Sequence, residues 1–150
     1  MTMPVTRSFD TYGAYREAVQ ALLASAARSL AIYDPDLSRS ALERPQAAAL
    51  LRALARHSPH PECIRILIRN RLFLEREAPA LLRLATDFPD RVRIRAVEET
   101  HGLPDDCFMV ADASDLVIRF HATGTRTGAA PLLARFESLW PHGTPVRAAL

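Results

Sequence analysis

The chain has 150 residues, 49% hydrophobic and 24% charged, which is typical of one globular domain and excludes a disordered or collagen-like chain. Its 19 basic residues nearly balance 17 acidic ones, and the resulting formal net charge of +2 is too weak by itself to indicate nucleic acid, so we expect no nucleic-acid partner. All 19 basic residues are arginines. Chemistry that depends on a lysine amine, such as Schiff-base formation or a P-loop, is therefore excluded.

Apolar runs and cysteine usage bear on the compartment. Cys63 and Cys107 each lie inside an apolar run and not in a CxxC pair, which predicts two free buried thiols. No stretch approaches the roughly 20 apolar residues of a membrane span. Residues 1–10 lack the basic start and apolar centre of a signal peptide. We therefore expect a single cytoplasmic domain over 1–150, with its core at about 10–142 and with loose tails.

Hydrophobic spacing predicts nine elements in chain order. Apolar residues three or four positions apart predict helices over 10–28, 45–56, 79–88 and 131–141, the first capped by Ser8 or Asp10. Alternating or continuous apolar runs predict strands at 30–33, 63–69, 91–97, 107–111 and 116–120.

The order of these elements predicts the fold. Early β-α-β crossovers require parallel pairing, whereas the last two strands, joined by a short turn, require an antiparallel hairpin. The sequence therefore predicts an α/β sandwich with a mixed sheet and helices on both faces. The predicted core consists of Ile32, Leu50, Leu54, Ile66, Ile68, Ile94, Phe108, Val110, Val117, Phe136 and Trp140.

The strand hairpin and the final Phe-x-x-x-Trp helix resemble one half of the phospholipase D superfamily. Active members carry a His-x-Lys-x4-Asp pattern, in which the histidine attacks phosphorus, the lysine holds the phosphoryl oxygens, and two halves complete one site. In the matching stretch the aspartate is present as Asp112, but Asp105 stands at the histidine position and Cys107 at the lysine position. The Gly-Ser-x-Asn that follows in active members is replaced by residues 119–122.

The chain is also similar to an uncharacterised bacterial domain of phospholipase D-like fold, found alone or behind GNAT acetyltransferase domains. The similarity lies in Asp-Pro-Asp-Leu at 34–37, in the strand, aspartate, strand, arginine order over 108–119, and in the aromatic pair of the last helix. The resemblance implies a pseudoenzyme: a non-catalytic interaction or ligand-binding module without catalytic residues, cofactor or metal. Because active relatives pair two halves, it also implies a homodimer or another protein partner.

Five polar residues make up a candidate ligand cleft. Two carboxylates follow the first strand, where open α/β sheets bind ligands, and either hold a hard cation or form an Asx turn around a proline. An aspartate and an arginine flank the hairpin and are expected to form an ion pair. A phosphoester hydrolase using Asp105 and Asp112 is a third hypothesis, although Cys107 cannot supply the cation that this attack needs. The cleft residues are Asp34, Asp36, Asp105, Asp112 and Arg119.

Arginines alternate along two of the predicted strands. The alternation places three of them on one face, and two more extend the stripe if the strands are neighbours, with Leu67 exposed beside them. Such a stripe is a candidate face for phosphate or nucleic acid. The alternative, which the near-neutral charge favours, is a charged edge strand that discourages aggregation, or simply a solvated face. The residues of the stripe are Arg65, Arg69, Arg91, Arg93 and Arg95.

Overall fold

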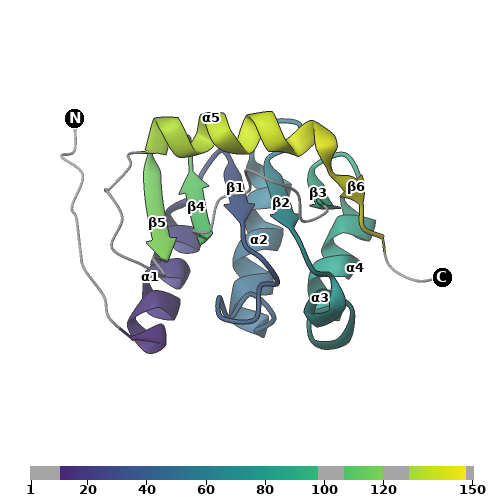
Figure 1. The fold of residues 1–150 in the computed structure, drawn as a ribbon, viewed down its shortest axis with the longest axis horizontal. Helices are drawn as coiled ribbons and strands as arrows, with labels where there is room; N and C mark the ends of the chain where they lie inside the picture. Colours follow the sequence, from purple (N-terminus) through teal and green to yellow (C-terminus); the bar gives the residue numbers. More distant parts are fainter. Residues whose placement is uncertain (1–10, 98–106, 120–128, 148–150) are drawn as a thin grey trace.

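The computed structural model describes residues 11–97, 107–119 and 129–147 (Figure 1). Helices and strands alternate along the first part of the chain, and a hairpin and a long helix follow. In chain order the elements are α1 (Tyr12–Ser25), β1 (Leu30–Tyr33), α2 (Pro45–His57), β2 (Ile64–Ile68), α3 (Leu72–Glu77), α4 (Pro79–Asp87), β3 (Val92–Ala96), β4 (Cys107–Ala111), β5 (Asp115–Arg119), α5 (Ala129–Leu139), a 3-10 turn (Trp140–His142) and β6 (Thr144–Pro145).

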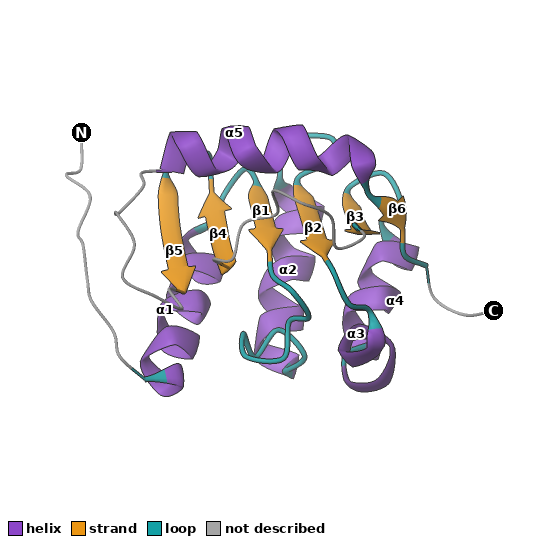
Figure 2. Cartoon of the chain, in the orientation of Figure 1, coloured by secondary structure: helices purple, strands orange, loops and turns teal. Residues whose placement is uncertain are grey.

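The six strands form one mixed sheet in the order β5-β4-β1-β2-β3-β6 (Figure 2). Strands β1, β2 and β3 are parallel, with Ile32 opposite Ile66 and Ile66 opposite Ile94. Strand β4 runs antiparallel to both β1 and β5, and β6 runs antiparallel to β3. The predicted α/β fold with a mixed sheet is confirmed.

Helices cover both faces of the sheet, so that the chain has two cores. The first core lies between the sheet and α1 to α4 and contains Ile32, Ile66 and Ile94. The second core lies under α5, which runs across the strands in Figure 1, and contains Tyr33, Phe108, Leu67, Val110, Phe136 and Trp140 among others. Alternate strand residues point to opposite faces, which is why neighbouring residues of β1 belong to different cores.

Local signals explain where three helices begin. The side-chain oxygen of Thr11 accepts a hydrogen bond from the Ala14 amide at 3.1 Å and caps α1. Thr11 thus occupies the cap position that was predicted for Ser8 or Asp10, which lie outside the described residues. Helices α2 and α4 begin at prolines, whose fixed φ suits the first turn.

Several sequence predictions were wrong in detail. Helix α3 was not predicted, and the segment after Gly143 is no loose tail, because β6 pairs with β3 and Val146 is buried in the first core. Leu67, predicted to be exposed, is fully buried because α5 covers its face of the sheet. Leu50 and Val117 are half-buried at the margin of the first core. Both predicted thiols are free and buried.

No helix in the described part of the chain is both long enough and apolar enough to span a membrane. Its longest helix, α1, has 14 residues, whereas a membrane-spanning helix needs about 20.

Candidate functional site

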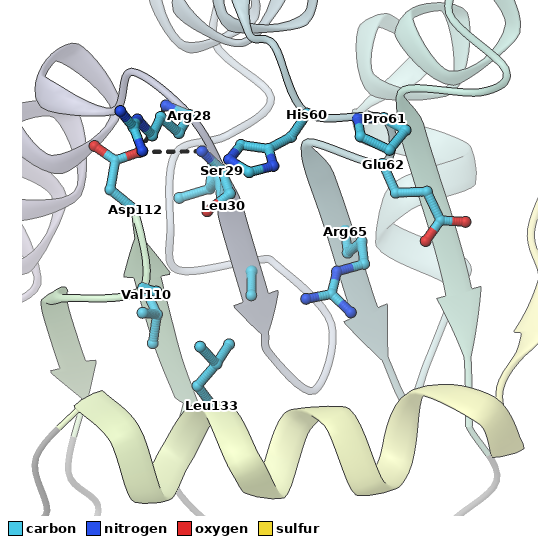
Figure 3. A pocket seen from close by; sticks show the side chains of 12 residues that line it. Arg28, Ser29, Leu30, His60, Pro61, Glu62, Arg65, Val110, Asp112 and Leu133 are labelled. Atoms are coloured by element: carbon cyan, nitrogen blue, oxygen red, sulfur yellow. Dashed lines mark hydrogen bonds between the residues drawn. The ribbon is translucent and has the colours of Figure 1, made fainter.

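A cleft of about 440 Å³ opens at the amino-terminal ends of β1 and β2, on the face of the sheet that carries α5 (Figure 3). Its floor is apolar and includes Val110 from β4 and Leu133 from α5. Its rim is polar and is formed by the segments that lead into the strands. The polar side chains around it are Arg28, His60, Glu62, Arg65 and Asp112. An apolar floor below a few polar groups is the usual composition of a ligand site.

The Asp112 carboxylate lies at the end of this cleft and caps the chain entering β1. Its oxygens accept hydrogen bonds from the amides of Ala27 at 3.1 and 3.2 Å, Arg28 at 2.7 Å and Ser29 at 3.0 Å. The amide of Asp112 in turn donates to the Ser29 carbonyl at 2.9 Å. Asp112 has a φ of 56°, a left-handed conformation that aspartate tolerates better than most residues.

These contacts set the protonation of Asp112. Partial burial by itself would raise the pKa of this carboxyl group, but the amides of Ser29, Arg28 and Ala27 and the charge of Arg28 outweigh it. The net effect lowers the pKa of Asp112 below its ordinary value. The carboxylate is therefore ionised at neutral pH, and its four hydrogen bonds are charge-assisted.

The predicted ion pair between Asp112 and Arg119 stays a prediction, because the structure does not describe the side chain of Arg119. In the β4–β5 hairpin, Arg119 is paired with Cys107, while Asp112 follows Ala111 at the turn. Four residue positions separate the two ends, roughly 13 Å at about 3.3 Å per residue. The hydrogen bonds of the Asp112 carboxylate go to the backbone of the segment before β1.

Asp34 and Asp36 lie away from Asp112. Asp34 follows β1 at its carboxyl end, which is the opposite edge of the sheet, and is fully buried. Its Oδ1 accepts from the amides of Asp36 at 3.1 Å and Leu37 at 2.9 Å, which is the Asx turn that the sequence offered as an alternative to a cation site. Asp36 accepts from both the amide and the hydroxyl group of Ser38. Asp105 lies outside the described residues.

The predicted arginine stripe exists as a row on one face of the sheet, but α5 covers that face. Arg65 is in register with Arg93, as the neighbouring strands require. The Arg65 guanidinium lies over the ring of Phe136 at 5.1 Å and forms an ion pair with Glu137, both on α5. Hydrogen bonding to Arg65 lowers the pKa of Glu137. Arg65 therefore attaches α5 to the sheet.

Arg95 makes a second contact of this kind. Its guanidinium lies 4.3 Å from the centre of the Trp140 ring and donates to the Trp140 carbonyl at 2.9 Å. The centre of the same ring is 5.8 Å from the Arg65 guanidinium, so one indole ring contacts two guanidinium groups. Trp140 and Phe136 stack on each other, with their ring centres 5.5 Å apart.

The other arginines of the stripe also have protein contacts. Arg93 pairs with Glu62 at 3.0 Å, and Arg91 donates to the Ser58 carbonyl at 2.6 Å. Arg69 lies beyond β2, at the edge of the sheet that carries Asp34. The edge strand predicted for these residues is wrong, because β6 pairs with part of β3.

The lysine position of the phospholipase D pattern is occupied by a fully buried thiol. Cys107 begins β4, and its exposed fraction is 0%. The other thiol, Cys63, is likewise buried, and burial raises its pKa. A thiol cannot supply the positive charge of the lysine that Cys107 replaces in this pattern. Among the described residues there is also no cluster of three or more metal-ligating side chains.

The sequence of this chain matches one known protein family. The family described as Domain of unknown function (DUF7931) matches residues 11–147. The chain belongs to the DUF7931 family. A search of curated proteins found no match.

Two solved structures share the fold of this DUF7931 domain at low identity. The phospholipase D family member Nuc from Salmonella typhimurium is 17% identical and has a TM-score of 0.57, with 89% of this chain covering 91% of Nuc. The archaeal chromatin protein TrmBL2 is 12% identical and has a TM-score of 0.65 over 92% of this chain. The DUF7931 chain spans about half of TrmBL2, 53% of its length. At these identities the likeness establishes the phospholipase D-like fold.

Sequence reasoning missed most of the cleft. Arg28, His60 and Leu133 come from three separate segments, and only the fold brings them together. The contacts between the arginine row and α5 did have a signal in the sequence. Planar guanidinium groups stack well on aromatic rings, so the alternating arginines and the later Phe-x-x-x-Trp are compatible partners.

Proposed function

We propose that this DUF7931 domain is a non-catalytic binding module that keeps the phospholipase D-like fold and does not hydrolyse phosphodiesters. The observation that carries the proposal is the position of Asp112. This aspartate is the one residue of the His-x-Lys-x4-Asp pattern of active phospholipase D members that the sequence retains. Its carboxylate accepts hydrogen bonds from three backbone amides. It is a structural group, with its oxygens directed at the chain and not at a substrate.

The chemistry of the neighbouring positions supports the same proposal. A phosphodiester carries negative charge, so its attack requires cationic groups that stabilise the transition state. The buried thiol of Cys107 supplies no such charge, and the chain contains no lysine. Two arginines on this face of the sheet already have carboxylate partners, since Arg65 is paired with Glu137 and Arg93 with Glu62.

A hydrolysis assay tests this proposal. We expect the purified chain to release p-nitrophenol from bis-p-nitrophenyl phosphate at the rate of buffer alone, and the Asp112→Asn and Asp105→Ala variants to give the same rate. Asparagine tolerates a left-handed φ, so the first variant should remain folded. Hydrolytic activity above background that copurifies with the chain, and that either substitution abolishes, would show that the domain is an enzyme.

A second candidate function is recognition of a phosphate-bearing ligand in the cleft. Both carboxylates that line the cleft have protein partners: Glu62 is paired with Arg93, and Asp112 accepts from backbone amides. In contrast, the side chains of Arg28 and His60 are exposed at the rim. The rim is therefore suited to an anion above an apolar floor. TrmBL2, which shares the fold, is described as binding DNA by a novel mode, so a nucleic acid is one source of such phosphates.

Binding to a fluorescent single-stranded oligonucleotide, measured by anisotropy over a series of salt concentrations, tests this candidate. We expect affinity to fall as salt rises and Arg28→Ala to weaken binding about tenfold. Arg56→Ala is the matched control, since Arg56 is exposed on α2, which covers the opposite face of the sheet. Absence of binding at low salt, or equal losses in the two variants, would contradict the candidate.

A further inference from the structure

Strand β5 is the outermost strand of the sheet at the end opposite β6 (Figure 1). Within the described part of the chain it pairs with β4 alone. Its other edge therefore presents a row of backbone N–H and C=O groups that no described strand pairs. Such an edge is a template for a further strand, and proteins usually protect it with charges, proline or a bulge.

The interior of β5 carries none of these protective residues. The strand reads Asp-Leu-Val-Ile-Arg, so three consecutive apolar residues lie between two charged ends. Leu116, Val117 and Ile118 are all half-buried. Leu116 and Ile118 contact the second core, whereas Val117 contacts the first, so apolar surface lies on both faces of the strand edge. An added strand would bury more of it.

The sequence of β5 is complementary to itself when two copies run antiparallel. With Val117 of one copy opposite Val117 of the other, Leu116 lies opposite Ile118, and Asp115 lies opposite Arg119. Both charged positions then face an opposite charge across the new pair, a favourable cross-strand arrangement. Any one-residue change of register removes this match and moves the apolar residues to the wrong faces.

The charged ends of β5 have no such match inside the sheet of one chain. In the β4–β5 register Asp115 is opposite Ala111 and Arg119 is opposite Cys107. Neither position on β4 carries a charge. The charge pattern of β5 is therefore not explained by pairing within the hairpin, but it does fit a second copy of the same strand.

We infer that β5 is a dimerisation edge. Two copies of this chain pair there through antiparallel β5 strands, so that their two six-stranded sheets become one continuous sheet. The interface is self-complementary about a two-fold axis through Val117, as expected for a homodimer. It does not depend on the proposed binding function, because it uses the edge of β5 that faces away from β4, whereas the cleft is lined from β1, β2, β4 and the β4–β5 turn.

Sedimentation velocity over a concentration series from about 1 to about 300 μM tests the inference, since a single strand pair makes a small interface with a weak, concentration-dependent dimer. We expect wild type to sediment as a dimer at the upper concentrations. Asp115→Arg places like charges opposite each other at both symmetric positions and should raise the dissociation constant about tenfold. The double variant Asp115→Arg, Arg119→Asp restores opposite charges and should restore the dimer.

Asp90→Arg is the matched control. It makes the same change in net charge at an exposed position before β3, far along the sheet from β5, and should leave the dimer unchanged. Circular dichroism of all variants should match wild type, because Asp115 faces an alanine in its own sheet. A monomeric wild type at the highest concentration, equal effects of Asp115→Arg and Asp90→Arg, or no rescue by the double variant would overturn the inference.

Discussion

Replacing Trp140 by alanine should lower the free energy of unfolding by about 3–5 kcal/mol, the largest single effect that we expect. The indole is 94% buried, stacks on Phe136, and lies under the guanidinium groups of both Arg65 and Arg95. Its loss leaves a cavity in the second core and removes the surface on which two arginines rest. Urea unfolding followed by far-ultraviolet circular dichroism measures the change, since the variant has no tryptophan to report.

The matched variant for this prediction is Trp140→Phe, which keeps an aromatic ring for the arginines and removes only part of the volume. We expect a loss of about 1–2 kcal/mol, less than half of the alanine effect. If alanine and phenylalanine proved equally destabilising, the contact between the rings and the guanidinium groups would contribute nothing. A change below about 1 kcal/mol for alanine would contradict the second core itself.

Replacing Asp112 by alanine should destabilise the fold by about 2–3 kcal/mol at neutral pH. Four charge-assisted hydrogen bonds to Ala27, Arg28 and Ser29 are lost, and alanine is placed at a φ of 56° that it adopts poorly. Asp112→Asn, which keeps an acceptor oxygen and tolerates the conformation, should lose about half as much. Urea unfolding of the three proteins separates the contributions of charge and backbone.

The effect of Asp112 should depend on pH. Because the folded chain lowers the pKa of this carboxyl group, its stabilisation is complete above the ordinary pKa of about 3.9 and is lost as pH falls through the lower folded value. The difference in unfolding free energy between wild type and Asp112→Ala should therefore shrink from pH 7 to pH 3. A difference that stays constant over this range would mean that the carboxylate is not ionised in its contacts with the amides.

The sheet could be predicted well because core-facing residues of a strand alternate with residues of the other face, and this period of two is visible in the sequence. Alternation in Ile64–Ile68 and in Val92–Ala96 locates β2 and β3 to within a residue, and the two helix-initial prolines locate α2 and α4. Helix α3 escaped notice because its six residues are too few to establish a helical period. Strand β6 is shorter still, with two residues.

The candidate site was harder to predict because it depends on contacts that are distant in sequence. Asp112 binds amides more than 80 positions away, and no local pattern indicates this. Arg65 and Arg95 were interpreted as solvent-facing because charged residues that alternate with apolar ones usually are. The planar guanidinium and its apolar stem pack against aromatic rings, so an arginine row can also lie beneath a helix.

Because α5 follows α1–α4 and β1–β5 in the chain, the two cores can close at different times during synthesis. Every buried member of the first core except Val146 precedes residue 112, so most of that core can form before the last helix has left the ribosome. The second core lacks Phe136 and Trp140 until then. In that interval Tyr33, Leu67 and Phe108 face water on a partly folded nascent chain, and this is the stage at which a chaperone has most to protect.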